Sequence, residues 1–312
     1  MVDSKQQWKA WLYLAPAIVL LLIFTVWPIF NTTVMAFQEG FNEMDAVRIG
    51  RWGFPIGLKN FQKVLNYPKF LSALKNTLIL CIPTVLISTF IALLISVCLN
   101  SIRPLQRLLQ TIYFLPYVTN SLAIGMVFSA MFNVVGNTAA TNPIIKSYGI
   151  INNIIMFFGG DYVNWINAGS SYETKLAVVM IYIIWNALPF KILILLGALQ
   201  SVNKQYYDAA KVDGTSKVRT FTRITVPLLS PMITYVVITG FIGGFKEYSN
   251  VVGIFDDSMA RTGELNTMVG LIYQSIVNSN TGVASAAALI LFAIIFVITM
   301  INLAISKKTT YY

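Results

Sequence analysis

Charged side chains are scarce in this chain of 312 residues: only 11% are Asp, Glu, Lys or Arg, whereas 56% are hydrophobic. Soluble globular domains carry about 25% charged residues, so this composition excludes an ordinary soluble domain. The mean hydropathy of +0.69 agrees with that exclusion. The composition therefore predicts an integral membrane protein.

Residues that carry redox and proton chemistry are also scarce. The chain has no histidine, and its two cysteines, Cys81 and Cys98, lie well apart in one apolar run, which favours neither a disulfide nor a metal site. No carboxylates cluster within an apolar run, so nothing indicates a redox centre or a proton relay. The sequence also lacks a Gly-x-x-x-x-Gly-Lys-Ser/Thr phosphate loop. We therefore expect no enzymatic activity, metal or cofactor in this chain itself.

Six apolar runs are long enough to cross about 30 Å of hydrocarbon as helices. They lie near Trp11–Met35, Thr77–Leu99, Ile112–Phe132, Leu176–Gln200, Pro227–Phe245 and Ala284–Ile305. The first run is too long for a signal peptide and no small-x-small cleavage site follows it, so we interpret it as a retained span. The predicted fold is an all-α membrane protein with six transmembrane helices.

Lys and Arg residues predict the orientation of the spans. Placing both termini in the cytoplasm assigns to that side the segments 1–10, 100–110, 201–230 and 306–312, which are richer in basic residues than the outer segments. The outer segment 35–75 is itself basic, but short loops weigh more in this rule than long ones. The net charge of +10 is explained by basic residues that flank spans and meet anionic lipid, so we expect no nucleic-acid partner.

A polar segment, Asp208–Pro231, separates the fourth apolar run from the fifth and reads DAAKVDGTSKVRTFTRITVPLLSP. Asp208 is a candidate N-cap for a helix, which the two alanines after it favour. The pair Asp213-Gly214 predicts a break with a positive φ. A second helix follows, and prolines mark its re-entry into the membrane.

The offsets within this segment resemble the "EAA" loop of ATP-binding-cassette importer permeases, by which the membrane subunit holds its ATPase. The matching positions are Ala209, Ala210, Asp213, Gly214, Phe221, Ile224, Pro227, Leu229 and Pro231. Two positions depart from the family pattern, since Asp208 replaces the usual Glu and Thr215 the usual Ala. The resemblance implies a cytoplasmic coupling-helix loop, residues 201–230, between helices 4 and 5. Its implied ATPase-docking residues are Asp208, Ala209, Ala210, Asp213, Gly214, Phe221 and Ile224.

Further stretches resemble the sugar branch of these permeases. They are Gly57–Leu78, Gly149–Asn152, Asn164-Trp165, Leu196–Gln200 and the Gly282 region before the last span. The segment Gly253–Asp257 departs from the Gly-Gly-Pro turn that this branch often has there, which leaves the substrate class less secure than the transport role. The resemblance divides the chain into residues 1–75 with the first span, a permease core of residues 76–305, and a cytoplasmic tail of residues 306–312.

Membership of this family implies several partners. The chain would form the translocation path of an ATP-driven importer of a carbohydrate, with an oligosaccharide as the expected cargo, in a bacterial-type cytoplasmic membrane. A second permease subunit, cytoplasmic ATP-binding subunits that bind ATP and Mg, and an external solute-binding protein would complete it. ATPase closure would then rock the spans, so that a midplane cavity opens to one side at a time.

Polar side chains inside apolar runs are candidates for the substrate path, because lipid-facing positions stay apolar. Aromatic rings stack on sugars and amides satisfy their hydroxyls, so Trp185 and Asn186 suit a carbohydrate. The full candidate set is Asn120, Tyr182, Trp185, Asn186, Tyr235 and Thr239. A Trp beside an Asn is as often a helix-packing pair, and the sequence leaves both roles open.

Lys191 is the one charge that falls clearly within an apolar run. Three roles stay open for it: snorkelling to an interface, pairing with a carboxylate of the partner permease, or facing the cavity. Lys246 and Glu247, at the outer end of the fifth run, either bind a solute or end a helix, and we favour the second interpretation.

Two rival functions remain at this point. One is a permease of the same family for glycerol phosphate or another polar solute, in which Lys191 would be the only candidate cation for an anionic cargo. The other is a membrane enzyme or receptor, which needs converging catalytic groups or a signalling domain, and the sequence indicates neither.

Overall fold

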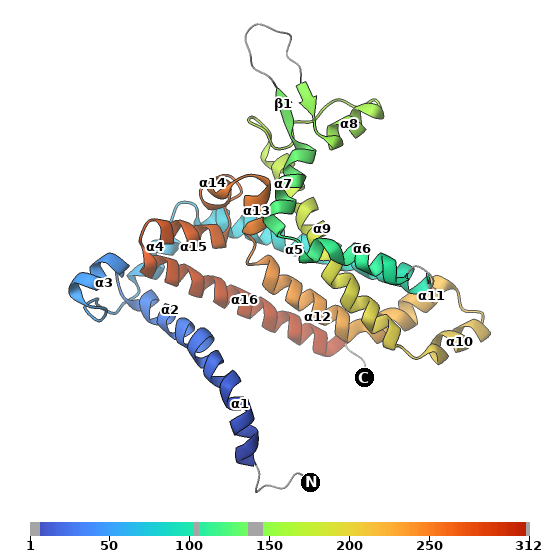
Figure 1. Cartoon of the computed structure of the whole chain (residues 1–312), viewed down its shortest axis with the longest axis horizontal. Helices are drawn as coiled ribbons and strands as arrows, with labels where there is room; N and C mark the ends of the chain where they lie inside the picture. The colour runs from blue at the N-terminus through green and yellow to red at the C-terminus, as the bar shows by residue number, and fades with distance from the viewer. Residues whose placement is uncertain (1–6, 103–105, 137–145, 310–312) are drawn as a thin grey trace. The chain divides into compact units, whose positions relative to one another are not determined.

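The computed structural model describes residues 7–102, 106–136 and 146–309, most of which are helical (Figure 1). The first helices are α1 (Gln7–Leu21), α2 (Trp27–Phe37), α3 (Glu43–Ile49), α4 (Lys59–Leu65), α5 (Phe70–Ser101), α6 (Gln106–Val118), α7 (Ser121–Phe132) and α8 (Ile150–Phe157). They continue with α9 (Tyr172–Ser201), α10 (Lys204–Val212), α11 (Lys217–Thr220), α12 (Val226–Gly244), α13 (Ser249–Ile254), α14 (Asp257–Arg261), α15 (Met268–Val277) and α16 (Thr281–Thr309). Two π-helical turns, η2 (Leu22–Val26) and η3 (Phe221–Thr225), join α1 to α2 and α11 to α12.

One short hairpin departs from the predicted all-α fold. Strand β1 (Val134–Gly136) pairs antiparallel with β2 (Lys146–Tyr148), and Val134 lies opposite Tyr148. Strands of three residues are too short for an alternating pattern to stand out in the sequence, so the prediction missed them.

Five helical stretches in the described residues are long and apolar enough to cross a membrane. They are Trp8–Phe37, Phe70–Ser101, Tyr172–Ser201, Lys217–Gly244 and Thr281–Ser306. A bent pair, Leu108–Val118 with Ser121–Phe132, makes a sixth if it counts as one span. The helical membrane fold is therefore confirmed, with five to six candidate spans.

The third predicted span, Ile112–Phe132, is not one straight helix, because a bend of 97° separates Leu108–Val118 from Ser121–Phe132. Helix α6 ends two residues after Pro116, and Asn120 then adopts an extended conformation. The Asn120 side chain accepts the backbone N–H of Leu122 at 2.8 Å and so caps α7. Asparagine at an N-cap favours a new helix start over continuation of the old one.

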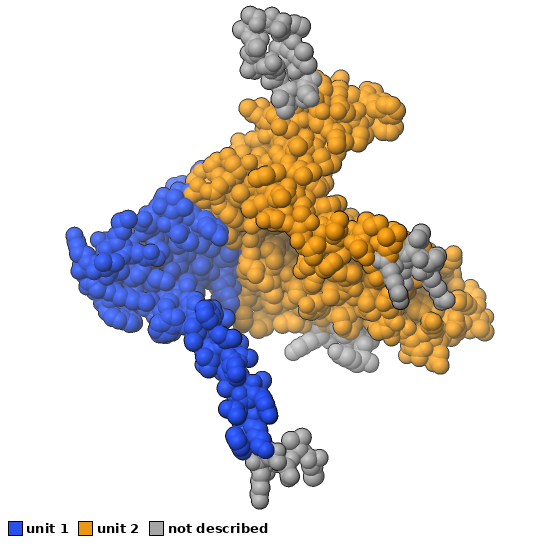
Figure 2. Space-filling model, viewed as in Figure 1, with its two compact units in different colours: residues 1–70, 271–292 blue, residues 71–270, 293–312 orange. Residues whose placement is uncertain are grey.

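The described chain forms two compact units, which Figure 2 colours separately. Unit 1 comprises residues 1–70 and 271–292, and unit 2 comprises residues 71–270 and 293–312. The family-based division at residues 75 and 305 therefore follows sequence resemblance rather than these compact units, and it stays a prediction. Helix α16 continues to Thr309, beyond the predicted end of the last span, and residues 310–312 of the predicted tail lie outside the described residues.

Unit 1 is held together around the buried Asn60 of α4. Its side-chain amide donates to the carbonyl of Ala36 at 3.1 Å and to that of Gln38 at 2.7 Å, and its Oδ1 accepts the N–H of Gly40. The N–H of Gly282, at the start of α16, donates to the carbonyl of Phe41 at 2.9 Å. These bonds fix the chain after α2 against α4 and α16.

Unit 2 contains two apolar cores. One gathers Leu80, Phe128, Val178, Tyr182 and Val251, from α5, α7, α9 and α13. The other gathers buried side chains of α5, α9 and α12: Ala92, Leu93, Ile192, Leu195, Leu196, Leu229 and Val236. Helix α9 contributes to both cores, and it carries three of the six candidate path residues, Tyr182, Trp185 and Asn186.

Glycines allow close helix contacts within unit 2. A Cβ on Gly125 of α7 would lie 2.7 Å from the Cα of Gly253 of α13, so the two backbones touch. On α12, a Cβ on Gly244 would lie 2.7 Å from Cys81 Sγ, and one on Gly240 would lie 3.0 Å from Val85. Small residues of this kind let membrane helices approach closely.

Candidate functional site

The predicted docking loop is a helix, a tight turn and a second helix. Helix α10 begins after Asn203, whose side chain accepts the N–H of Gln205 at 3.0 Å. Asp208 lies within α10 rather than at its start, so the predicted cap at Asp208 is wrong. Asn203 is a strong N-cap residue five positions earlier, and the helix forms from there.

Gly214 ends helix α10 with a φ of +63°. Its N–H donates to the carbonyl of Lys211 at 3.1 Å, and the N–H of Thr215 donates to the carbonyl of Ala210 at 2.9 Å. This pair of bonds is the Schellman motif, which places a left-handed residue directly after a helix. The predicted positive φ is therefore confirmed. Since no atom lies within 4 Å of a Cβ built at Gly214, the backbone conformation alone, and not a lack of space, favours glycine there.

The second half of the loop leads directly into α12. Ser216 caps α11, and η3 carries the chain on without a break to Val226. The hydroxyls of Tyr207 and Thr225 lie 3.3 Å apart and link α10 to the base of this helix, while Phe221 packs against the core of unit 2. The loop is thus tied to the helix that it precedes.

The surface of the loop exposes both polar and apolar side chains. Ala209 is exposed, whereas Ala210 is 5% exposed and packs inward. Val212 is 87% exposed and lies outside the candidate spans, and Val218, the second residue of the stretch Lys217–Gly244, is 74% exposed. Exposed apolar side chains in a polar loop are typical of a surface that a partner covers.

A pocket of about 240 Å³ lies within unit 2 among the helices that carry the candidate path. Its walls come from α5, α6, α9, α12 and α13. Its polar side chains are Thr84, Ser88, Tyr117, Asn186, Lys191, Thr239, Glu247 and Asn250. Glycines of α12 form part of the opposite wall, so backbone is accessible there.

A chain of hydrogen bonds orients three of these residues. The Asn186 amide donates to Asn250 Oδ1 at 3.4 Å, and the Asn250 amide donates to Glu247 Oε2 at 3.1 Å. Glu247 Oε1 accepts the backbone N–H groups of Tyr248 and Asn250, both at 3.1 Å. Glu247 thus holds the backbone at the start of α13 and at the same time lines the pocket. Burial raises the pKa of the Glu247 carboxyl to about 7, and these hydrogen bonds offset only part of that effect.

Lys191 lines the same pocket, but its ammonium is already satisfied. Lys191 Nζ donates to Ser88 Oγ at 2.7 Å, to Thr89 Oγ1 at 2.9 Å and to the carbonyl of Val85 at 3.1 Å. An ammonium has three N–H donors, and these three acceptors of α5 use them all. With the side chain only 4% exposed, Lys191 joins α9 to α5 and does not snorkel.

The pocket brings together two of the six predicted path residues, Asn186 and Thr239. Tyr182 is fully buried, donates its hydroxyl to the carbonyl of Ser121 and packs on Phe128. Trp185 also packs on the ring of Phe128, with 5.2 Å between centroids. The other two, Asn120 and Tyr235, are exposed and lie outside the pocket lining.

Sequence reasoning missed an aromatic pair at the pocket. The rings of Tyr117 and Phe190 stack with their centroids 5.7 Å apart, and both residues line the pocket. It also missed Asn250 and favoured the helix-ending interpretation of Glu247. The sequence does show that Asn250 is a polar residue shortly after the fifth span. It does not show that Asn250 contacts Asn186 of α9.

Comparison with known proteins identifies the class to which these helices belong. Two solved structures of a bacterial alginate ABC transporter superpose on this helical arrangement with TM-scores of 0.79 and 0.78, at 20% and 22% identity. The first covers 99% of this chain and 97% of the chain compared, in a complex with an alginate pentasaccharide-bound periplasmic protein. At such identity the likeness shows the fold alone.

The sequence itself establishes the family. Residues 85–311 match the model for the binding-protein-dependent transport system inner membrane component, and the chain belongs to that family. The arabinooligosaccharides transport system permease protein AraP of Halalkalibacterium halodurans is 30% identical over 96% of this chain and 88% of its own length. AraP of Bacillus subtilis is 28% identical over 95% of this chain and 88% of its own length. The lactose transport system permease protein LacF of Rhizobium radiobacter is 28% identical over 78% of this chain and 74% of its own length.

Proposed function

We propose that this chain is the membrane-spanning permease subunit of an ATP-driven importer for an uncharged oligosaccharide. The observation that carries the proposal is the pocket of unit 2, in which amides, a hydroxyl and a stacked aromatic pair line a cavity between span helices. Amides and hydroxyls suit the hydroxyls of a sugar, and an aromatic face suits its C–H groups. The relatives AraP and LacF, which are permeases for arabino-oligosaccharides and lactose, support this cargo class.

The state of Lys191 favours an uncharged cargo over glycerol phosphate. An anionic solute needs a cation with free donors, and the three N–H groups of Lys191 are occupied by α5. The Glu247 carboxyl in the same lining adds negative charge when it is ionised. Both features oppose an anion at this position.

The size of the pocket supports a path that a second permease completes. Ligand pockets usually enclose about 300–1,000 Å³, whereas this one has about 240 Å³. We propose that an oligosaccharide crosses between this chain and a similar partner, with Asn186 and Thr239 on this side. Direct sugar contacts of Asn120, Tyr182, Trp185 and Tyr235 stay predictions, and the buried Tyr182 is the weakest of them.

The loop of residues 201–230 is our proposed ATPase-docking element. Val212 and Val218 would be covered by the partner, and the Schellman turn at Gly214 would set the angle between α10 and α11. Because η3 and α12 form one helical stretch with α11, movement at the loop would reach the pocket wall directly. ATP and Mg would bind the partner ATPase, and this chain would perform no hydrolysis itself.

The proposed membrane arrangement follows from the basic loops. Both termini and residues 201–230 would face the cytoplasm, and residues 35–75 and 245–283 would face outside, where a solute-binding protein delivers the sugar. The structure of the alginate transporter with its periplasmic protein supports such a partner.

The test is sugar uptake by the assembled importer in proteoliposomes. We expect Asn186→Leu, which keeps the volume and removes the amide, to lower arabino-oligosaccharide uptake by about tenfold or more, since one buried hydrogen bond to sugar is worth about 1–2 kcal/mol. Asn302→Leu is the matched control, because it makes the same change on α16, outside the pocket lining, and should leave uptake unchanged. Uptake of glycerol phosphate in preference to neutral sugars, or normal uptake by Asn186→Leu, would contradict the proposed cargo and path.

A further inference from the structure

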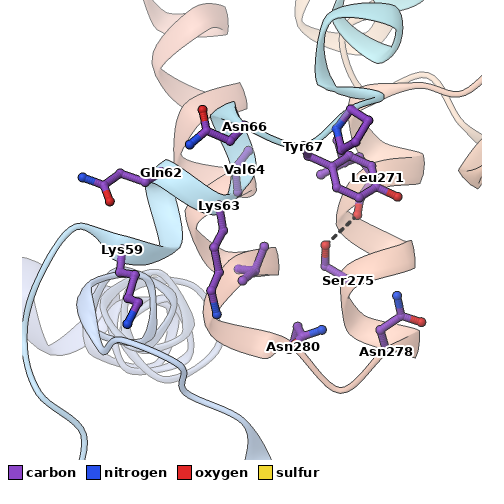
Figure 3. Close-up of a pocket in the computed structure, with 12 residues that line it drawn as sticks. Lys59, Gln62, Lys63, Val64, Asn66, Tyr67, Leu271, Ser275, Asn278 and Asn280 are labelled. Atoms are coloured by element: carbon purple, nitrogen blue, oxygen red, sulfur yellow. Dashed lines mark hydrogen bonds between the residues drawn. The ribbon is translucent and has the colours of Figure 1, made fainter.

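Unit 1 contains a second, larger pocket that the transport path does not use. It has a volume of about 530 Å³ and lies between α4 and the corner that joins α15 to α16 (Figure 3). Its lining is Lys59, Gln62, Lys63, Val64, Asn66, Tyr67, Pro68, Leu271, Ser275, Asn278, Asn280 and Val283. All these residues belong to unit 1.

Two lysines give this pocket its charge. Lys59 and Lys63 are four residues apart on α4, so they share one helical face, and Figure 3 shows Lys63 extending from α4 into the pocket. Both side chains are exposed, and neither takes part in the ion pairs found among the described residues. Glu39 accepts the backbone N–H of Lys59 at 3.4 Å, but its carboxylate is not in any ion pair found among the described residues. The lysines therefore offer a ligand six N–H donors.

Amides line both sides of the pocket. Gln62 and Asn66 come from α4 and the residue after it, and Asn278 and Asn280 come from the corner on the far side (Figure 3). With the two ammoniums, these groups favour a ligand rich in acceptor oxygens.

The two asparagines of the corner, Asn278 and Asn280, flank a residue with a strained backbone conformation. Ser279 has a φ of +56°, and within the described chain it is the one residue other than glycine with a positive φ. Its N–H donates to Ile276 and that of Asn280 donates to Ser275, both at 2.9 Å, which is again the Schellman motif. A residue with a side chain is strained in this left-handed conformation. Backbone strain of this kind is found at binding and functional sites.

The walls of the pocket are fixed before a ligand arrives. Asn60, next to Lys59, is fully buried and makes three hydrogen bonds to the end of α2 and the chain that follows it. A Cβ on Gly282, two residues after Asn280, would lie 2.8 Å from Asn60 Nδ2, so α16 packs closely on the same hub. A fixed site loses little conformational entropy on binding.

Apolar side chains are exposed in the same segments. Leu65 is 56% exposed, Ile276 is 47% exposed and Val277 is 62% exposed, and the half-exposed ring of Tyr67 lines the pocket. Protein interfaces combine such apolar groups with a polar rim and enriched aromatic residues. This combination favours a protein partner over a small free anion.

We propose that the Lys59–Lys63 pocket docks an Asp or Glu side chain on a surface loop of the external solute-binding protein. The inference rests on the proposed function, which places residues 35–75 and 245–283 on the outer face. A carboxylate would accept from the two ammoniums and from the amides of the corner, while the apolar side chains would cover its loop. The pocket thus recognises the delivery protein, whereas the pocket of unit 2 recognises the sugar.

The experiment uses the complete importer in nanodiscs and the soluble protein that stimulates its ATP hydrolysis in the presence of sugar. We expect the double variant Lys59→Glu/Lys63→Glu to raise the half-saturating concentration of that protein by about three- to tenfold, since reversing two rim charges weakens attraction at the interface. The rate at saturation should stay unchanged. Added salt should weaken docking of the wild type more than that of the variant.

Two matched variants distinguish docking at this pocket from a general effect of surface charge. Arg48→Glu reverses an exposed charge of α3 outside the pocket, and it should leave the half-saturating concentration unchanged. A carbodiimide couples a lysine amine to a carboxylate that touches it, so Lys59 or Lys63 should form an amide with an acidic residue of the soluble protein. Lys59→Arg/Lys63→Arg keeps the charge, and it should keep docking but lose this cross-link.

The outcomes distinguish the two proposals. An unchanged half-saturating concentration in the double Glu variant would overturn the docking inference alone, and so would a fall only in the saturated rate. Failure of any soluble sugar-binding protein to stimulate the wild-type importer would overturn the proposed function, and the docking inference with it.

Discussion

Lys191 Nζ lies 2.7 Å from Ser88 Oγ, so a positive charge within the fourth span is bound to a neutral hydroxyl of the second. The same ammonium reaches Thr89 and Val85 on α5. Ser88 and Thr89 in turn donate to carbonyls of their own helix, at 2.5 Å and 2.7 Å. Lys191 thereby joins two span helices and provides no free cation for a cargo.

The first prediction concerns the charge of the side chain at position 191. Lys191→Met keeps the length of the side chain and leaves Ser88 and Thr89 bonded to α5, so we expect normal membrane abundance and a small change in unfolding temperature. Lys191→Glu places a carboxylate against acceptor oxygens and should destabilise the chain by about 3 kcal/mol or more. Thermal unfolding of the purified variants in detergent measures both. Equal stability of Lys191→Glu and the wild type would contradict the donor role.

The second prediction concerns the contact of Gly125 with Gly253. In Gly125→Ala the new methyl group would lie 2.7 Å from a backbone atom of α13, so we expect a loss of about 1–3 kcal/mol from overpacking. Gly243→Ala is the matched control, because it has open space at its Cβ and should be neutral or stabilising. The measurement is again thermal unfolding in detergent, and the reverse order of the two variants would refute the contact.

The third prediction concerns pH and Glu247. Its pKa is raised from an ordinary 4.5 to about 7, so the folded chain holds this proton more tightly than the unfolded chain does. The resulting stabilisation is complete below pH 4.5 and is lost as the pH rises through 7. The unfolding temperature of the wild type should therefore fall more between pH 5 and pH 8 than that of Glu247→Gln. Glu43→Gln, at an exposed carboxylate of α3, should fall like the wild type. Equal falls in all three would show that Glu247 titrates normally.

The fourth prediction is the orientation of the loop of residues 201–230. Single cysteines at Lys204 or Lys217, both exposed, are placed in a chain that carries Cys81→Ala and Cys98→Ala. They should resist an impermeant thiol reagent in intact cells and react in inverted vesicles, because the proposed loop is cytoplasmic. Labelling in intact cells would reverse the topology and remove the ATPase-docking role.

Local chemistry made some features predictable from the sequence. The pair Asp213-Gly214 predicts a left-handed turn, because few residues other than glycine adopt that conformation. Long apolar runs likewise predict spans, because a helix that crosses the hydrocarbon core needs about 20 mostly apolar residues. The sequence offers two favourable N-cap residues, Asn203 and Asp208, and does not show which of them begins the helix. We predicted Asp208, but the helix begins after Asn203.

Contacts between distant segments could not be predicted in the same way. Tyr182 and Asn186 are one turn apart on a span that is apolar around most of its surface, yet one is buried against α7 and the other faces the pocket. Periodicity does not separate these faces when lipid and core are both apolar. The hydrogen bond from Asn186 to Asn250 joins residues 64 positions apart, which no local pattern reveals.

The proposed coupling of the sugar path to a separate ATPase depends on the turn at Gly214. Gly214→Val would strain a φ of +63° by about 1–2 kcal/mol and misalign α10 with α11, whereas Gly214→Asn tolerates that conformation. Thr215→Ala, one residue further, leaves the turn intact.

The decisive measurement is sugar-stimulated ATP hydrolysis by the reconstituted importer, normalised to the amount of this chain in the membrane. We expect a sharp loss in Gly214→Val at near-normal abundance, with Gly214→Asn and Thr215→Ala close to the wild type. Normal stimulated hydrolysis in Gly214→Val, at normal abundance, would contradict the proposed coupling.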